Sequence, residues 1–156
     1  MISATHLHSM IIHFPIALLI AGFFSEVIAL ITKKNFFKNV AFYLLILGAI
    51  GTVASYLSGE SAGEGIENGP LKIPIDLHED AAVFTLWLAI ITAAFKVMVY
   101  FMKWEAKWTK WTGILLFTLL IGSVSRTGYL GGQLVFKHGA GIELALPDFS
   151  NTEPED

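Results

Sequence analysis

The chain contains no cysteine, so disulfides, thiolate metal sites and cysteine nucleophiles are excluded. Charge is also scarce: only 15% of the residues are charged, against about 25% in an average soluble domain. The sequence has no phosphate-binding glycine loop, no serine nucleophile elbow and no basic patch of the kind that binds nucleic acid. We therefore expect no nucleic-acid partner, and any chemistry must come from other residue types.

Apolar residues are what the chain has in abundance. They make up 54% of its 156 residues, and the mean hydropathy is +0.65. A soluble chain of this size would leave large apolar patches exposed, so the composition indicates a membrane protein in contact with the lipid bilayer. Four apolar runs cover residues 10–31, 39–58, 78–102 and 112–136. At about 1.5 Å per residue, the first run reaches roughly 30 Å, the thickness of the hydrocarbon layer.

These runs predict the fold class all-α, an integral membrane antiparallel four-helix bundle. We expect residues 1–145 to form a single transmembrane domain and residues 146–156 to form an acidic, flexible tail. Lysines crowd the first connection (Lys33, Lys34, Lys38) and the third (Lys103, Lys107, Lys110), whereas the middle connection is mainly acidic. The positive-inside rule then predicts a multi-pass protein with the first and third connections in the cytoplasm and both termini outside.

All five histidines lie at ends of apolar runs that should share one side of the membrane: His6, His8, His13, His78 and His138. Neutral imidazoles can bind a transition metal or the iron of a haem. The alternative is that they present polar tips to water and headgroups. His13 lies one turn inside its run, where a polar group needs a partner. A helix that begins near Ile12 would place Pro15 in its first turn and leave His8 in a preceding segment folded over the site.

Three charged residues complete the candidate set. Glu60 follows the second run and is either a ligand or a solvated loop charge. Arg126 lies about 15 Å below the end of the fourth run, a depth at which a cation usually faces a partner or a cavity. Glu26 and Lys96 both lie near the lysine-rich side, so they either form an ion pair between the first and third runs or leave Lys96 to snorkel alone.

Four motifs resemble those of a bacterial membrane family, domain of unknown function 2231: HSMIIHFPIAL, SGESAGE, LHED and GGQLVFKHGAGIE. The similarity runs from about His8 to Ile142. The family's opening pattern is His-Pro-x-x-x-His-Phe-Pro, with Ser9 here in place of the first proline, and Phe136 stands where the closing pattern often has tyrosine. The resemblance implies four helices in the bacterial inner (cytoplasmic) membrane and points to the histidines at 8, 13, 78 and 138. It implies no activity.

The leading hypothesis is a haem b electron-transfer component. The cofactor would be held by His13, His78 and His138, with Arg126 balancing a propionate. The alternative is a zinc, copper or iron site that uses His8, His13, His78, His138 and Glu60. A third hypothesis is a small structural subunit of a larger membrane complex. The first hypothesis also implies a redox protein as partner.

Overall fold

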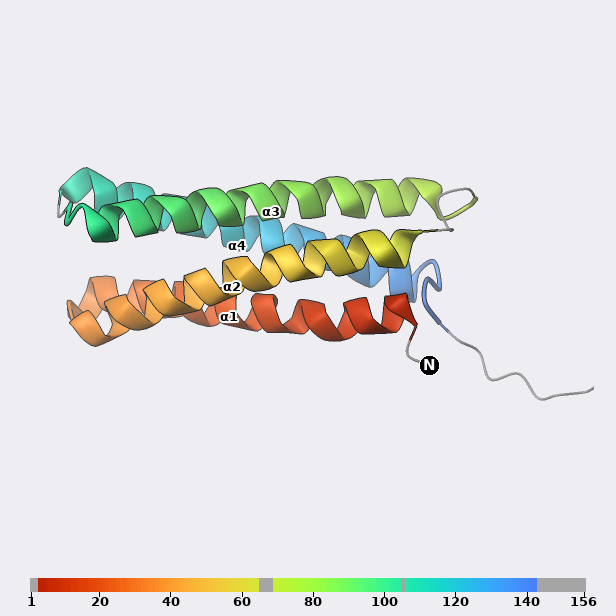
Figure 1. The fold of residues 1–156 in the computed structure, drawn as a ribbon, viewed down its shortest axis with the longest axis horizontal. Coiled ribbons are helices and arrows are strands. Elements are labelled where there is room, and N and C mark those ends of the chain that lie inside the picture. The colour runs from red at the N-terminus through yellow and green to blue at the C-terminus, as the bar shows by residue number, and fades with distance from the viewer. Residues whose placement is uncertain (1–2, 65–68, 105, 143–156) are drawn as a thin grey trace, which may run out of the picture.

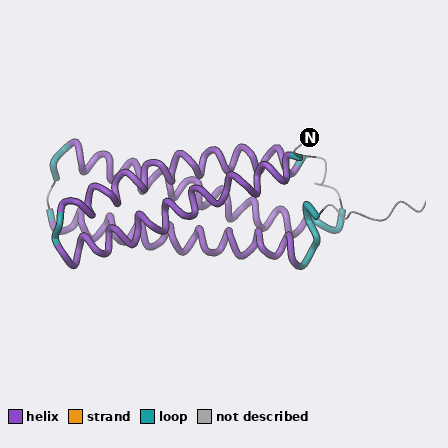
Figure 2. The backbone as a smooth tube through the Cα atoms, turned by 90° about the horizontal axis from the view of Figure 1, so that it is seen from below, coloured by secondary structure: helices purple, strands orange, loops and turns teal. Residues whose placement is uncertain are grey.

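The structure is a computed structural model that describes residues 3–64, 69–104 and 106–142. The predicted acidic tail, residues 146–156, lies outside the described residues. Four helices follow one another: α1 (Ala4–Thr32), α2 (Asn35–Gly63), α3 (Lys72–Phe101) and α4 (Lys107–Phe136). They lie side by side and alternate in direction, as Figures 1 and 2 show. The predicted antiparallel four-helix bundle is confirmed.

All four helices are long and apolar enough to cross a membrane. At 29 or 30 residues each, they reach about 44 Å, more than the roughly 30 Å hydrocarbon layer. Many large apolar and aromatic side chains are exposed along these helices, such as Phe14, Ile31 and Trp111, which suits contact with lipid. The chain is therefore a multi-pass membrane protein.

The two ends of the bundle differ in composition. The histidine end is formed by the start of α1, the end of α2, the start of α3 and the end of α4, and it lies on the right in Figure 1. The lysine end holds the two other connections. There Lys33 adopts a left-handed conformation (φ 56°) and its N–H donates to the carbonyl of Ala29 at 2.8 Å, which ends α1.

Helix α1 begins earlier than the sequence predicts. The helix does not begin near Ile12. It begins at Ala4, where Ser3 caps it by accepting a hydrogen bond from the N–H of His6 at 3.3 Å. Pro15 consequently lies inside the helix, where it packs against α2. A Cβ built on Gly51 would lie 3.1 Å from the Cβ of Pro15, so the glycine lets the proline ring approach. His8 is therefore part of α1.

The other boundaries shift in the same sense. The predicted runs 39–58, 78–102 and 112–136 become helices that start four to six residues earlier, and α2 continues five residues further, through Gly63. The extra turns are polar or amphipathic, such as Ser-Gly-Glu-Ser-Ala-Gly at the end of α2. Hydropathy alone cannot detect them, because they extend beyond the hydrocarbon layer.

Helices pack most closely within each hairpin, α1 against α2 and α3 against α4, and the two hairpins pack more loosely on each other. This arrangement places α1 and α3 on one diagonal of the bundle. Leu19, Leu45 and Phe117 fill the middle and are at most 1% exposed. Gly48 makes room for Leu19, since a Cβ on Gly48 would come within 2.7 Å of two Leu19 carbons.

The two hairpins repeat one another in register. The buried positions Pro15, Leu19 and Gly22 of α1 correspond, 70 residues on, to the buried Thr85, Ala89 and Thr92 of α3. A shift of 72 residues relates Ala41, Leu45 and Gly48 of α2 to Gly113, Phe117 and Leu120 of α4. The bundle therefore has a pseudo-two-fold axis along its length, and each hairpin supplies equivalent positions to the interior.

Glu26 and Lys96 are equivalent positions in this repeat, and they meet across the diagonal near the lysine end. The ammonium of Lys96 donates to a carboxylate oxygen of Glu26, and the side chains are only 17% and 12% exposed. Gly113 provides the space, because a Cβ there would lie 3.0 Å from the Cε of Lys96. Of the two alternatives that the sequence leaves open, the structure shows the ion pair between α1 and α3.

Candidate functional site

The interior of the histidine end contains His8 and His78. Each lies 18 residues before a member of the ion pair, His8 before Glu26 and His78 before Lys96. Eighteen residues are five turns of an α-helix, about 27 Å. Because Glu26 and Lys96 face the bundle axis, both histidines face the same axis at the opposite end. The two histidines occupy equivalent positions of the two hairpins, 70 residues apart.

The ring of His8 is held by α2. Its Nδ1 lies 2.9 Å from the hydroxyl oxygen of Ser58, and that hydroxyl already donates its hydrogen to the carbonyl of Ser55 at 2.9 Å. Ser58 can therefore only accept from His8, because a serine hydroxyl carries one hydrogen. The bond requires a hydrogen on Nδ1 of His8 and leaves Nε2 unprotonated in the neutral ring.

The ring of His78 is held in the equivalent way by α4. Its Nδ1 donates to the backbone carbonyl of Thr127 at 3.1 Å. The hydroxyl of Thr127 joins a network with Thr85 at 2.8 Å, and Thr85 in turn lies 2.6 Å from the hydroxyl of Ser123. Since a carbonyl only accepts, Nδ1 of His78 also carries the hydrogen. A carbonyl acceptor on the second ring nitrogen is the arrangement usual for metal-binding histidines.

Two equivalent glycines let the rings pack closely against α2 and α4. A Cβ built on Gly59 would lie 3.1 Å from Cε1 of His8, and one on Gly131 would lie 3.0 Å from Cε1 of His78. Nearby on α2, the hydroxyl of Ser55 is buried and has no hydrogen-bond partner among the described residues. A buried hydroxyl without a partner usually indicates a water or a ligand group beside it. The site thus has two imidazoles packed against glycines and an unsatisfied hydroxyl.

The other sequence-predicted residues are placed elsewhere. His13 is exposed on α1, and its Nδ1 donates to the carbonyl of Ser9 in its own helix at 2.6 Å. His138 follows the end of α4 and is half-buried, with its backbone N–H on the carbonyl of Gln133. Glu60 and Arg126 are exposed. The structure does not bring His13, His78 and His138 together, and no group of three or more potential metal-binding side chains occurs in the part of the chain it describes.

A signal for the His8–His78 pair was present in the sequence. A shift of 18 residues links His8 to Glu26 and His78 to Lys96, and such a shift keeps residues on one helix face. His13 lies 13 residues before Glu26, which turns it by about 220° to the other side of α1. The depth of His13 in the apolar run gave no information about which side of the helix it occupies.

The sequence itself matches a family model described as "Predicted membrane protein (DUF2231)" over residues 4–144. The chain belongs to this family. The predicted family membership is confirmed, and the match covers all four helices of this DUF2231 protein. No curated protein and no solved structure matches the chain.

Proposed function

We propose that this DUF2231 protein holds a haem b between His8 and His78 and acts as an electron-transfer component of the membrane. One observation carries the proposal: both rings commit their Nδ1–H to a neighbouring helix, which leaves two unprotonated Nε2 atoms on facing helices. A haem iron takes two axial ligands, and the bound cofactor supplies one-electron transfer. One imidazole from each of the two diagonally placed helices α1 and α3 matches that number.

Other features of the site fit a flat group. Gly59 and Gly131 let the imidazoles lie against α2 and α4. The two hairpins pack more loosely on each other than the helices within each hairpin, so a flat group would enter by separating the hairpins. Ser58 and the Thr127 carbonyl would fix the direction of each imidazole, which pre-organises ligand binding. The buried Ser55 hydroxyl can donate to a polar edge of the group. Relative to the sequence-based hypothesis, His8 takes the place of His13 and His138, and Arg126 has no role in this site.

A zinc, copper or iron site remains the alternative, and it would need at least a third protein ligand for zinc or copper. Glu60 is adjacent in sequence to Gly59 but is exposed. The third hypothesis, a structural subunit, assigns the histidine pair to packing alone. Haem content and metal content separate these possibilities in one purified sample.

Substitution of the histidines tests the ligand pair. The protein purified from cells supplied with haem should show a Soret band, and His8→Ala or His78→Ala should abolish the spectrum of a six-coordinate haem because one axial nitrogen is lost. His13→Ala is the matched control: it lies on the same helix, but its ring is exposed, so the spectrum should be unchanged.

The outcome can contradict the proposal in two ways. A wild-type protein that binds no haem but contains about one zinc or copper per chain would support the non-haem alternative, and one with neither would support the structural hypothesis. Loss of the spectrum in His13→Ala, with retention in His8→Ala, would show that the axial pair is wrongly assigned.

We also propose that the histidine end faces the outside of the bacterial inner membrane. The lysines at 33, 34, 38, 103, 107 and 110 gather at the opposite end, and basic residues in short connections favour the cytoplasmic side. Alkaline phosphatase fused at the C-terminus should therefore be active, and the same enzyme fused after Lys107 should be inactive. The reverse pattern would place the candidate site on the cytoplasmic side.

A further inference from the structure

Arg126 is a cation on the outer surface of a membrane helix. It is exposed, and it makes no ion pair or side-chain hydrogen bond with any residue that the structure describes. It lies about 7 Å beyond the midpoint of α4 toward the histidine end, at 1.5 Å per residue. The haem proposal does not use it. A guanidinium at this depth is costly unless it meets a partner or water.

The direction of the side chain makes water hard to reach. Side chains on an α-helix tilt toward the helix N-terminus, and the N-terminus of α4 is at the lysine end. The Cα–Cβ bond of Arg126 therefore tilts toward the lysine end and away from the nearer, histidine end. To reach the nearer headgroups at the histidine end, the side chain would have to turn back along α4 and extend about 8 Å further.

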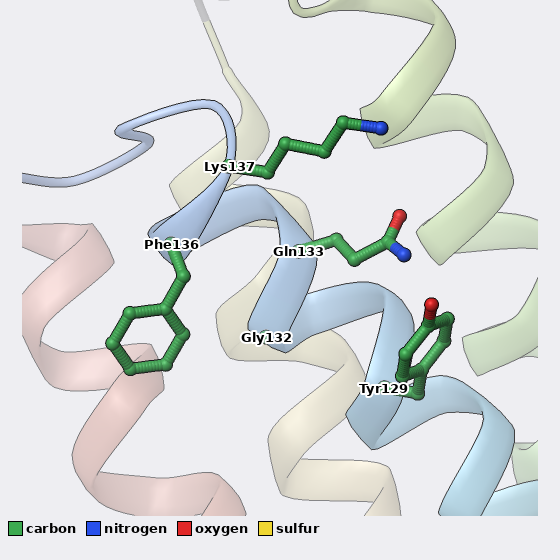
Figure 3. A pocket seen from close by; sticks show the side chains of 5 residues that line it. All are labelled: Tyr129, Gly132, Gln133, Phe136 and Lys137. Atoms are coloured by element: carbon green, nitrogen blue, oxygen red, sulfur yellow. The ribbon is translucent and has the colours of Figure 1, made fainter.

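A polar stripe continues from Arg126 along the same side of α4. Tyr129, Gln133 and Lys137 follow at helical spacing, and Figure 3 shows their side chains projecting to one side while that of Phe136 projects to the other. A shallow groove of about 480 Å³ lies here, lined by Tyr129, Gly132, Gln133, Phe136 and Lys137. We call Arg126, Tyr129, Gln133 and Lys137 the polar stripe of α4.

Two glycines on this surface of α4 do not make room for any neighbouring side chain that the structure describes. A Cβ built on Gly131 or on Gly113 would lie about 3 Å from a side chain of α3. A Cβ built on Gly122 or on Gly132 would have no atom within 4 Å. Glycine weakens a helix relative to alanine. Small residues on a lipid-exposed helix allow another helix to approach closely. The open glycines lie one turn before Arg126 and one turn beyond Tyr129.

We propose that the polar stripe of α4 is the docking surface for a membrane helix of another protein, one that carries a carboxylate at the depth of Arg126. The Arg126 guanidinium pairs with that carboxylate, Gly122 and Gly132 admit the helix backbone, and Tyr129 and Gln133 offer hydrogen bonds. Within the apolar layer a carboxylate is the side-chain group that compensates a guanidinium best, because it accepts two parallel hydrogen bonds.

Two other occupants fit less well. A lipid phosphate lies outside the hydrocarbon layer, more than about 15 Å from its middle, and Lys137 is the cation at that level. A second copy of the chain bound through the same surface would place two Arg126 side chains opposite each other, because a two-fold interface uses the same patch twice. Like charges in the apolar layer would repel.

A model helix provides the test. The protein carries no native cysteine, so one introduced at Lys110 can be labelled with a fluorescent donor. The probe is a leucine–alanine transmembrane peptide of about 22 residues with one glutamate near its middle and an acceptor dye. In phosphatidylcholine vesicles, energy transfer should show about tenfold tighter association with the glutamate peptide than with its glutamine counterpart.

Variants identify the surface. Arg126→Leu should remove the preference for glutamate, Arg126→Lys should retain part of it, and Gly122→Leu should weaken binding of both peptides. Circular dichroism and thermal unfolding show that each variant is folded. Equal binding of the two peptides to wild type would overturn the proposal. Loss of the glutamate preference on adding phosphatidylglycerol would also overturn it, because an anionic lipid would then occupy Arg126. Energy transfer between two copies of the protein that depends on Arg126 would overturn it as well.

Discussion

Replacing Lys96 by methionine is expected to lower the free energy of unfolding by about 3–5 kcal/mol, and replacing Glu26 by leucine should have a comparable effect. Both side chains are largely buried, and each is the charged partner of the other. Removing one leaves the other charge in an apolar interior without compensation. Removing both deletes the charges together, so the double variant should be more stable than either single variant.

The measurement is a double-mutant cycle on the purified protein, with unfolding followed by circular dichroism in a denaturing detergent. The coupling energy between the two sites should be several kcal/mol, on the scale of a buried pair. Lys72 and Asp76 provide the control, because they form an ion pair at 3.5 Å with side chains 58% and 54% exposed. Coupling there should not exceed about 1 kcal/mol. A Glu26–Lys96 coupling no larger than that of the control would show that the buried contact contributes little.

Hydropathy was sufficient to predict the architecture. A membrane helix must satisfy its own backbone hydrogen bonds and bury its apolar length in lipid, so four apolar runs give four helices in the order that the structure has. The same logic fails at the helix ends. Residues 72–77, Lys-Ile-Pro-Ile-Asp-Leu, are helical, but they mix charge, proline and apolar residues and read equally well as a loop.

The ion pair could be predicted because a buried charge must either pair with an opposite charge or reach water. Glu26 and Lys96 lie at similar depth on helices one and three, and an uncompensated carboxylate in an apolar run is costly. Depth along each helix follows directly from residue number. The sequence left open only whether Lys96 reaches Glu26 or the interface, and that depended on Gly113, which leaves room for the lysine stem.

The candidate site was harder to predict, because it depends on which way each helix is rotated about its own axis. His8 and His13 differ by about 140° around α1, so only one of them can face the interior. The sequence favours His13 by depth, whereas the structure turns His8 inward and leaves His13 outside. Rotation is fixed by packing, chiefly of Pro15 on Gly51 and Leu19 on Gly48, and such contacts are not visible in a hydropathy pattern.

The pseudo-two-fold repeat explains why the site is a pair. His8 and His78 occupy equivalent positions of the two hairpins, and so do Gly59 and Gly131, which lie 72 residues apart. Each hairpin therefore brings one imidazole, one hydrogen-bond acceptor and one glycine to the axis. The repeat is hidden in the sequence because the equivalent residues differ in type elsewhere, as with Pro15 and Thr85.

Replacing Gly131 by valine is expected to displace the ring of His78 and abolish its hydrogen bond to Thr127. A Cβ at this position would already lie 3.0 Å from Cε1 of His78, and the methyl groups of valine would extend further into the ring. Overpacking at such a contact forces side chains from their preferred positions. If the imidazole binds haem, the affinity should fall by about tenfold to a hundredfold, the usual effect of losing the group that orients a ligand.

Gly128→Val is the matched control, because it lies on the same helix and a Cβ there meets nothing within 4 Å. Nitrogen NMR of histidine-labelled protein without haem reports the tautomer directly. Wild type and Gly128→Val should show His78 protonated at Nδ1, while Gly131→Val should show a mixture of tautomers because the Thr127 carbonyl no longer selects one. This readout does not depend on haem. An unchanged His78 signal in Gly131→Val would mean that α3 and α4 separate to admit the side chain, and that the glycine does not position the ring.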